Sequence, residues 1–512
     1  MAEQRPPSSN VGVESTVASS KVMPICEERL TNSKLEEDQV IIISISDHMM
    51  TSSLEGDGDG YSGEHHDNPP QDSWLPITES RKGSSFTAAF HLMCSGIGIQ
   101  ALLLPLAFVS LGWFWGIICL TVAYSWQLYT IWLLVNLHEP SPQSGIRYSR
   151  YLHLSIVAFG EKLGKLVAIF PTLYLSSGTC VIYIITGGTT MELLFQSICE
   201  NNLECKSKAL TGAEWCLVFI CLAILISQFF PNLDSLTSVS IIGSVTALSY
   251  CALLCVLSII KGKPDDLVDD VIILNNDATS KIRNVLNGLG IIALAFRGHN
   301  LVLEIQGTIP TNLKQPSRKS MWRGVTISYL VIAMTVYPLA IVGYWAYGNK
   351  MPVKGGILSA FTKFNQSSTS KYIIGSIYIL IIVNYLCTFQ IYAMPAFDNF
   401  ERIYTTKKNK PCTRLVRSII KVLFGGVTYF VAVAIPFLPS LGAFVGSLAL
   451  PLTLAYPCLM WICIKKPKQF SRMWAINMGL GYSGILLSTL CAGAGLWSLI
   501  VNGLEANFFK PK

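Results

Sequence analysis

The sequence predicts an all-α polytopic membrane protein with eleven transmembrane helices. The chain has 512 residues, of which 51% are hydrophobic and only 13% are charged, and its mean hydropathy is +0.46. An ordinary soluble domain carries about 25% charged residues, so this composition excludes a nucleic-acid-binding protein and almost any soluble enzyme of this length. Strands of a transmembrane β-barrel alternate apolar and polar residues. The long uninterrupted apolar blocks of this chain therefore predict helices.

The N-terminal segment differs in charge from the rest of the chain. Residues 1–83 hold 15 acidic and 6 basic residues, a net charge of −9, whereas the remainder carries +16. The segment is rich in Ser, Gly, Asp and Glu, which predicts a disordered acidic tail. Such a tail is suited to binding cytoplasmic regulators. The overall charge of +7 does not indicate a nucleic-acid partner, because it comes from the membrane part.

Eleven apolar blocks follow the tail, within a membrane domain that covers residues 84–512. Each block reaches the roughly 20 residues that a helix needs to cross a bilayer. The blocks cover residues 86–110, 113–137, 165–194, 213–231, 235–260, 284–308, 321–346, 372–397, 417–435, 441–463 and 474–501.

The distribution of Lys and Arg between the loops predicts the orientation. With the N-terminus inside, the inner segments near the membrane carry 20 basic residues and the outer loops carry 12, and basic residues favour the cytoplasmic side. Eleven helices then put the C-terminus outside. Two features agree with this orientation, because the glycosylation sequon at Asn365 and the cysteines Cys199 and Cys205, a candidate disulfide, fall in outer loops.

Two further features of the sequence are its cysteines and the apolar residues in the loop at residues 138–165. The 15 cysteines form no CxxC pair and no metal-ligand cluster, so no metal site is expected. Apolar residues from Tyr148 to Phe159 suggest an amphipathic helix at the inner face. An ordered connecting loop is the alternative.

Two of the apolar blocks carry breaks. The first contains Cys94–Ile99 with two glycines, and the sixth contains Phe296–Asn300 with one. Unwound backbone is tolerated in a membrane only where it lines a cavity or binds something. Breaks five helices apart are typical of inverted five-helix repeats, helices 1–5 and 6–10, with a substrate site between them and helix 11 extra. Helix packing through small residues is the alternative.

Broken helices suit a zwitterionic ligand. The N-termini of half-helices concentrate unpaired N–H groups and positive dipole, which favours a carboxylate. Open carbonyls favour an ammonium group or a coupling cation. Such a site recognises the head group common to all amino acids.

Several segments resemble a known family. The run His91–Pro105 is similar to the first-helix motif of the amino acid/auxin permease family. The run Gly298–Gln306, followed by Ile309 and Pro310, resembles the sixth-helix motif of its plant lysine/histidine transporter-like branch, and so do Tyr344–Gly348, Gln390–Asp398 and Lys408–Cys412. The resemblance runs from about Trp74 to the end of the chain.

The resemblance implies a LeuT-like fold and amino acid import coupled to protons, usually at the plasma membrane. By position, it implies that the backbone of Ser95, Gly96, Ile97 and Gly98 binds the substrate carboxylate. Phe296 and Gly298 would line the sixth-helix side. This chain departs from many relatives at Gln100 and Arg297, which leaves the substrate range open, lysine and histidine included.

Arg297 is the least expected residue of the sixth block. Its guanidinium stays charged at any relevant pH. At roughly 6–8 Å and an effective dielectric near 20, it would repel a cationic substrate side chain by about 2–3 kcal/mol. We therefore expect neutral or acidic substrates. The alternative is a structural arginine that pairs with Glu304 or caps carbonyls.

Three ionisable residues inside apolar blocks are candidates for proton coupling, since such residues are costly in a membrane: His91, His299 and Glu304. The alternative for each histidine is a hydrogen-bonded packing residue. Polar residues of helices 3 and 8 are candidates to complete the pocket, namely Tyr174, Ser177, Thr179, Tyr183, Asn384 and Tyr385. Interhelical hydrogen bonds are their alternative role. Asp234, Asp398 and Glu401 are expected to pair with nearby bases.

These patterns predict a proton-coupled amino acid symporter that imports neutral or acidic amino acids by alternating access. No enzyme activity and no cofactor are expected, because the proton gradient supplies the energy. The chain has no phosphate-binding GxxxxGK[ST] loop, which disfavours ATP-driven transport. The expected partners are the amino acid, protons and the lipid bilayer. Two alternatives remain, an amino acid sensor of transporter-like fold and a carrier of another small organic acid. An endomembrane location also remains open.

Overall fold

The computed structural model describes residues 74–140, 146–199, 210–264, 278–296, 298–312, 315–352, 355–438, 442–502 and 508–509. All of them belong to one compact unit, residues 63–512. Most of the predicted acidic tail, Arg297 and Cys205 lie outside the described residues. The regular elements of the described chain are all helices and include no strand, which confirms the all-α prediction for these residues.

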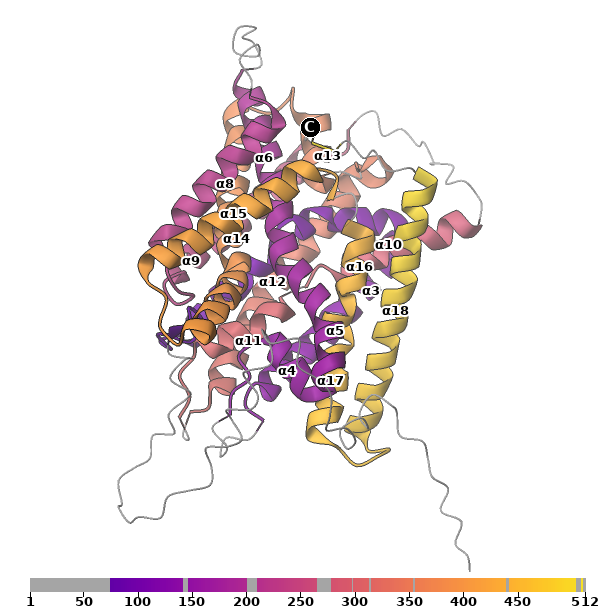
Figure 1. The fold of residues 1–512 in the computed structure, drawn as a ribbon. Coiled ribbons are helices and arrows are strands. Elements are labelled where there is room, and N and C mark those ends of the chain that lie inside the picture. The colour runs from indigo at the N-terminus through magenta and orange to yellow at the C-terminus, as the bar shows by residue number, and fades with distance from the viewer. Residues whose placement is uncertain are drawn as a thin grey trace, which may run out of the picture. The chain divides into compact units, whose positions relative to one another are not determined.

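Figure 1 shows the helices in chain order. Their bounds are α2 Ser85–Gly96, α3 Ile99–Leu137, α4 Tyr151–Phe159, α5 Glu161–Leu173, the π-helical turn η3 Tyr174–Gly178, α6 Thr179–Ile198, α8 Gly212–Phe229, α9 Thr237–Lys261, α10 Ala278–Ala293, α11 His299–Gly307, α12 Ser317–Tyr347, the 3₁₀ turn η5 Gly348–Lys350, α13 Gly356–Asn365, α14 Lys371–Lys408, α15 Arg414–Ala434, α16 Gly442–Leu454, α17 Tyr456–Lys465 and α18 Arg472–Asn502.

The first apolar block is broken where the sequence predicts it. α2 ends at Gly96, Ile97 is extended, and α3 begins after Gly98, whose φ is −153° and ψ is −148°. A second bend lies at Gly112, where φ is 74°, a value that favours glycine. This bend falls between the first and second predicted blocks, so α3 contains the end of one block and all of the next.

The sixth apolar block is also broken. α10 ends at Ala293, and α11 begins at His299 after Gly298, whose φ of 139° is accessible mainly to glycine. Nine helical stretches of the described chain are long and apolar enough to cross a membrane. The pieces of the sixth block are not among them, because α10 has 16 residues and α11 has 9. Eleven crossings and inverted repeats therefore stay predictions.

The helices differ in which side chains they bury. All nine residues of α11 are buried, as are most residues of α2. By contrast, α15 exposes large apolar side chains along one face, including Leu415, Leu423 and Phe430. In a bilayer such a face is solvated by lipid, whereas α2 and α11 form the centre of the bundle. Their breaks therefore lie inside the protein.

The loop at residues 138–165 contains the predicted helix, α4, and α5 follows it directly from Glu161. Residues 74–83, which the sequence places in the tail, pack against the helices. Leu75 and Ile77 are buried, and the backbone N–H of Gly83 donates to the carbonyl of Thr308. The packed part of the chain therefore begins before the predicted domain boundary at residue 84.

Candidate functional site

The two helix breaks face each other. A methyl group placed on Gly298 would lie 4.0 Å from the hydroxyl oxygen of Ser95. On the other side, a methyl group on Gly98 would lie 2.6 Å from the hydroxyl of Tyr183, so a larger residue at position 98 would displace this hydroxyl. Gly96 packs in the same way against Ile332, and Ile97 is fully buried. The structure thus brings the predicted residues of both breaks together.

Hydroxyl groups hold the carbonyls of the broken segments. Tyr392 donates to the carbonyl of Ser95 at 2.9 Å, and Thr388 donates to that of Cys94 at 3.1 Å. Tyr329 donates to the carbonyl of Phe296 at 2.9 Å. These bonds satisfy backbone oxygens that helix breakage leaves open.

The first turns of α3 and α11, which follow the breaks, have backbone N–H groups that can bind an anion. Gly98 and Gly298 are the N-cap residues of α3 and α11, and neither supplies a side-chain cap. The first N–H groups of a helix have no partner within the helix, and the helix dipole is positive there. Two such ends close together can bind a carboxylate. Phe296, predicted to line this site, packs edge-on against Tyr124 with ring centres 5.4 Å apart.

The predicted pocket residues of α5 to α6 and of α14 divide into two groups. Tyr183 reaches the first break, as described above. Thr179 donates to the carbonyl of Leu175 in its own helix at 2.9 Å, and Tyr174 stacks on the exposed ring of Phe170. Asn384 donates to the carbonyl of Gly243 on α9 at 2.9 Å, so it joins α14 to α9. For Thr179 and Asn384 the predicted alternative, a packing hydrogen bond, describes these contacts.

Asn300 contributes a contact that the sequence did not indicate. Its side-chain nitrogen donates to the hydroxyl of Ser176 at 3.1 Å, within the π-helical turn η3. Such turns are rare and occur frequently at functional sites. Asn300 thus couples the start of α11 to the middle of the third apolar block. Its place inside the sixth-block motif was the only signal for it.

His91 is fully buried on α2 and contacts α9. Its Nδ1 lies 2.6 Å from the Ser240 hydroxyl, and Ser240 donates to the carbonyl of Leu236. Because that hydroxyl has one proton, Nδ1–H of His91 is the donor to Ser240. Nε2 of His91 then carries a lone pair and has no partner among the described residues.

His299 has the opposite arrangement at the start of α11. Its Nε2 lies 2.9 Å from the hydroxyl of Thr130, which donates to the carbonyl of Gln127. Nε2–H of His299 is therefore the donor, and Nδ1 has no partner within the described chain. Both histidines are thus held in a defined tautomer with one open nitrogen.

Glu304 lies near a buried ion pair at the other end of α11. Arg150 contacts Asp398 through two hydrogen bonds of 2.7 and 3.2 Å, and both side chains are about 10% exposed or less. Glu304 is close enough to interact electrostatically with both of them. Its Oε2 has no hydrogen-bond partner among the described residues. Arg297, its partner in the alternative interpretation of that arginine, lies outside them.

The other acidic residues at this end also have partners. Glu401 pairs with Arg417 at 3.0 Å, and Asp234 accepts hydrogen bonds from the Ser80 hydroxyl and from the backbone N–H of Lys82. The predicted pairing of Asp398 and Glu401 with bases is therefore confirmed. Asp234 instead anchors the segment that precedes α2.

A second ion pair closes the same end of the helices. Arg147 contacts Glu139 at 3.1 Å and donates to the carbonyls of Gln306 and Ile309 beyond α11. Beside them, burial and then the charges of Arg147 and Arg81 hold the pKa of His138 well below its usual value. Arg147 therefore connects the C-terminal end of α3 to the C-terminal end of α11.

Two predicted modification sites lie away from the breaks. Cys199 is disulfide-bonded, and its predicted partner Cys205 lies outside the described residues. Asn365 is buried, and its side-chain nitrogen donates to the hydroxyl of Tyr347 at 3.1 Å. Glycosylation there would require this bond to break. Among the described residues no group of three His, Cys, Asp or Glu side chains could hold a metal ion.

Comparison with known proteins decides the family. The family described as transmembrane amino acid transporter protein matches residues 81–501. The chain belongs to this family. The match covers both breaks and every described residue of the candidate site.

Relatives of this transporter are found in plants. Lysine histidine transporter-like 8 of Arabidopsis thaliana is 50% identical over 86% of this chain and 84% of its own length. Lysine histidine transporter-like 7 is 46% identical over 86% of this chain and 90% of its own length, and GABA transporter 1 is 26% identical over 84% and 93%. A solved outward-open Na⁺-coupled sialic acid symporter matches 84% of this chain and 93% of its own, with a TM-score of 0.48 and 11% identity.

Membership decides several points. The transporter is a multi-pass membrane protein of an amino acid transport family and is not an enzyme. Its substrate class is therefore the amino acids, and its environment is the lipid bilayer. The resemblance to the lysine/histidine transporter-like branch is confirmed.

Proposed function

We propose that this transporter is a proton-coupled symporter that imports neutral or acidic amino acids across the plasma membrane by alternating access. In this proposal the chain crosses the membrane eleven times, helices 1–5 and 6–10 form inverted repeats, the N-terminus is cytoplasmic and the C-terminus is extracellular. The observation that carries the proposal is the meeting of the two helix breaks at Ser95 and Gly298.

The break geometry supports recognition of an amino acid head group. The open helix starts at Ile99 and His299 would receive the carboxylate, because their N–H groups and dipoles are positive. The carbonyls of Ser95 and Phe296 already accept from tyrosine hydroxyls, and each carbonyl oxygen has a second lone pair for an ammonium group.

Proton coupling would use a group near this site. His91 is the leading candidate, since it lies on α2 one turn before Ser95 and has an open nitrogen. His299 is the second candidate, because it begins α11 beside Gly298. Glu304 is a third candidate, further along α11 and next to the Arg150–Asp398 pair. A substrate bound at the breaks would contact the elements that carry all three groups.

The substrate preference rests on Arg297, whose position in the sequence is directly before Gly298. A permanent positive charge there favours an acidic or neutral side chain over a basic one.

The ion pairs at the inner end would form the cytoplasmic gate. Arg150–Asp398 and Arg147–Glu139 join the loop around α4 to α14 and to the end of α11. Opening toward the cytoplasm would separate these charges. Rebinding them would close that side, which alternating access requires.

Uptake and current in oocytes test the proposal directly. A panel of acidic, neutral and basic amino acids is applied at about pH 5.5 and about pH 7.5, on either side of the ordinary histidine pKa. We expect inward current and accumulation for acidic or neutral amino acids, larger at the lower pH. Arg297→Gln should improve uptake of basic amino acids. Confirmed surface expression with no flux of any amino acid would refute symport and would favour a sensor.

A further inference from the structure

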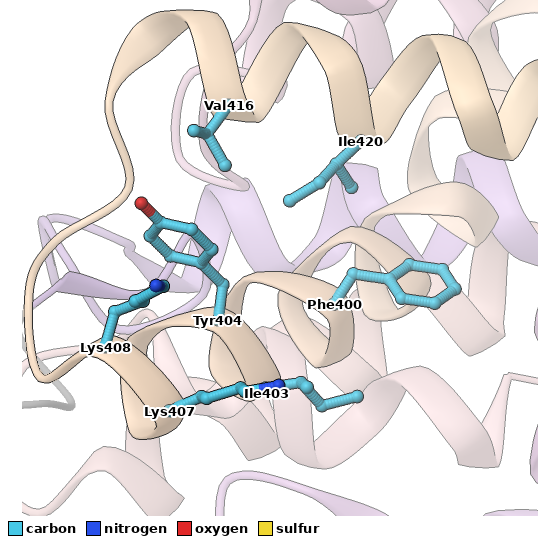
Figure 2. A pocket seen from close by; sticks show the side chains of 7 residues that line it. All are labelled: Phe400, Ile403, Tyr404, Lys407, Lys408, Val416 and Ile420. Carbon is cyan, nitrogen blue, oxygen red and sulfur yellow. The ribbon is translucent and has the colours of Figure 1, made fainter.

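An apolar groove with basic residues at one end lies at the inner ends of α14 and α15. Its volume is about 360 Å³, and it is lined by Phe400, Ile403, Tyr404, Lys407, Lys408, Val416 and Ile420. Figure 2 shows the hydroxyl of Tyr404 and the side chain of Lys408 toward the turn that joins the helices, with Phe400 and Ile420 at the far end.

The groove has the polarity of a phospholipid. Lys408 ends α14, and Phe400 lies eight residues earlier, about 12 Å along the helix axis. A head group at the lysines would therefore place its acyl chains along Phe400 and Ile403. Both of these side chains are about half exposed, and they line the groove together with Val416 and Ile420 of α15.

The two lysines of the groove can bind an anion. Within the described part of the chain, Lys407 and Lys408 form neither an ion pair nor a hydrogen bond with an acidic residue. Lys410 and Arg414 follow in the same turn and are exposed. Each lysine near an anionic membrane surface contributes roughly 1 kcal/mol of attraction, and the cytoplasmic leaflet carries the anionic lipids.

We propose that this groove binds an anionic phospholipid of the inner leaflet. Lys407 and Lys408 contact the phosphate, Tyr404 donates a hydrogen bond to it, and the acyl chains lie between Phe400, Ile403, Val416 and Ile420. The site is separate from the helix breaks. Because the same two helices carry Glu401 and Arg417 of the inner-end ion pairs, a bound lipid would stabilise the end of the protein that must open.

Lipid binding to the purified full chain tests this proposal. The probes are phosphatidylserine, phosphatidylcholine and soluble glycerophosphoserine, and bound lipid is counted by native mass spectrometry in detergent. We expect phosphatidylserine to bind more tightly than phosphatidylcholine. The variant Lys407→Gln/Lys408→Gln should bind it about 30-fold more weakly, the effect of removing two such lysines. Glycerophosphoserine should not bind measurably, since it has no acyl chains.

Two matched variants separate the groove from general charge and bulk. Lys466→Gln/Lys468→Gln removes the same charge at the turn between α17 and α18 and should leave binding unchanged. Val416→Trp fills the groove without changing charge and should weaken binding, whereas Val422→Trp on the exposed face should not. Equal binding of both phospholipids, wild-type binding by the Lys407/Lys408 variant, equal loss in both lysine pairs, or tight binding of glycerophosphoserine would each overturn the proposal.

Discussion

The hydroxyl of Tyr392 donates a 2.9 Å hydrogen bond to the carbonyl oxygen of Ser95, 297 residues away in sequence. This bond joins α14 to the unwound end of α2. It satisfies a buried oxygen that would otherwise lose its helical partner, and it orients the segment that we propose to bind substrate.

Tyr392→Phe should therefore weaken transport more than folding. Loss of one bond to a buried carbonyl costs about 1–3 kcal/mol, which corresponds to a KM roughly 5- to 150-fold higher if the substrate-bound state carries the cost. Radiolabelled uptake as a function of substrate concentration measures it. Tyr372→Phe, at an exposed site on the same helix, is the control and should leave KM unchanged.

Gly298→Ala should destabilise the sixth-helix break. A methyl group there has room, because its nearest neighbour is the Ser95 hydroxyl at 4.0 Å, but a φ of 139° is strained for any residue with a Cβ atom. We expect a loss of about 1–3 kcal/mol, seen as a lower melting temperature in detergent together with reduced uptake. Gly479→Ala, in open space within α18, should instead leave stability unchanged or slightly higher. Equal effects of both variants would contradict this explanation.

His91→Gln should abolish the dependence of uptake on external pH while leaving some uptake. Glutamine can still donate to Ser240, so the packing contact survives, but it has no group that titrates near neutral pH. Uptake at several external pH values measures the effect. His299→Gln is the matched comparison, because its contact with Thr130 is of the same kind. If only His299→Gln flattens the pH profile, the coupling residue is His299.

Breaking the Arg150–Asp398 pair should be costly. Removing one partner leaves a buried charge, with a penalty of about 3–5 kcal/mol. Arg150→Ala and Asp398→Ala should each lower the melting temperature, and the exchange Arg150→Asp/Asp398→Arg should recover part of the loss. As the control, Glu161→Ala removes the exposed pair with Lys165 and should cost well under 1 kcal/mol. No recovery in the exchanged variant would show that orientation, not charge, holds this end.

The breaks were predictable and their surroundings were not. Gly98 and Gly298 mark the breaks locally, because glycine within an apolar block lowers the cost of unwinding. Tyr329 and Thr388, which hold the adjacent carbonyls, carry no such mark. Tyr174 and Tyr183 are both tyrosines of the third apolar block. Of these two, Tyr183 contacts the first break, whereas Tyr174 stacks on Phe170. Which face of a helix points inward depends on its neighbours.

For the ion pairs, too, the sequence indicated one partner and the structure identified the other. The sequence indicated that Asp398 and Glu401 would pair with bases, since they follow the apolar block 372–397 at a helix end. It could not indicate that Arg150 and Arg417 are the bases, because they lie in other elements. The sequence also offered Arg297 as an alternative partner of Glu304, and that residue lies outside the described part of the chain. Among the described residues, Asp398 and Arg150 act on Glu304 electrostatically.

By itself, the sequence determined the helical class, the apolar blocks and the places where two of them break. These features follow from local physics, since each backbone group in hydrocarbon must find a partner within a few residues. Only the tertiary structure decided that the breaks meet at Ser95 and Gly298, which hydroxyls satisfy their carbonyls, and which basic residue pairs with Asp398. The contacts of Ser95 with Gly298 and Tyr392, and of Arg150 with Asp398, join residues about two hundred or more positions apart, and packing of whole helices selects them.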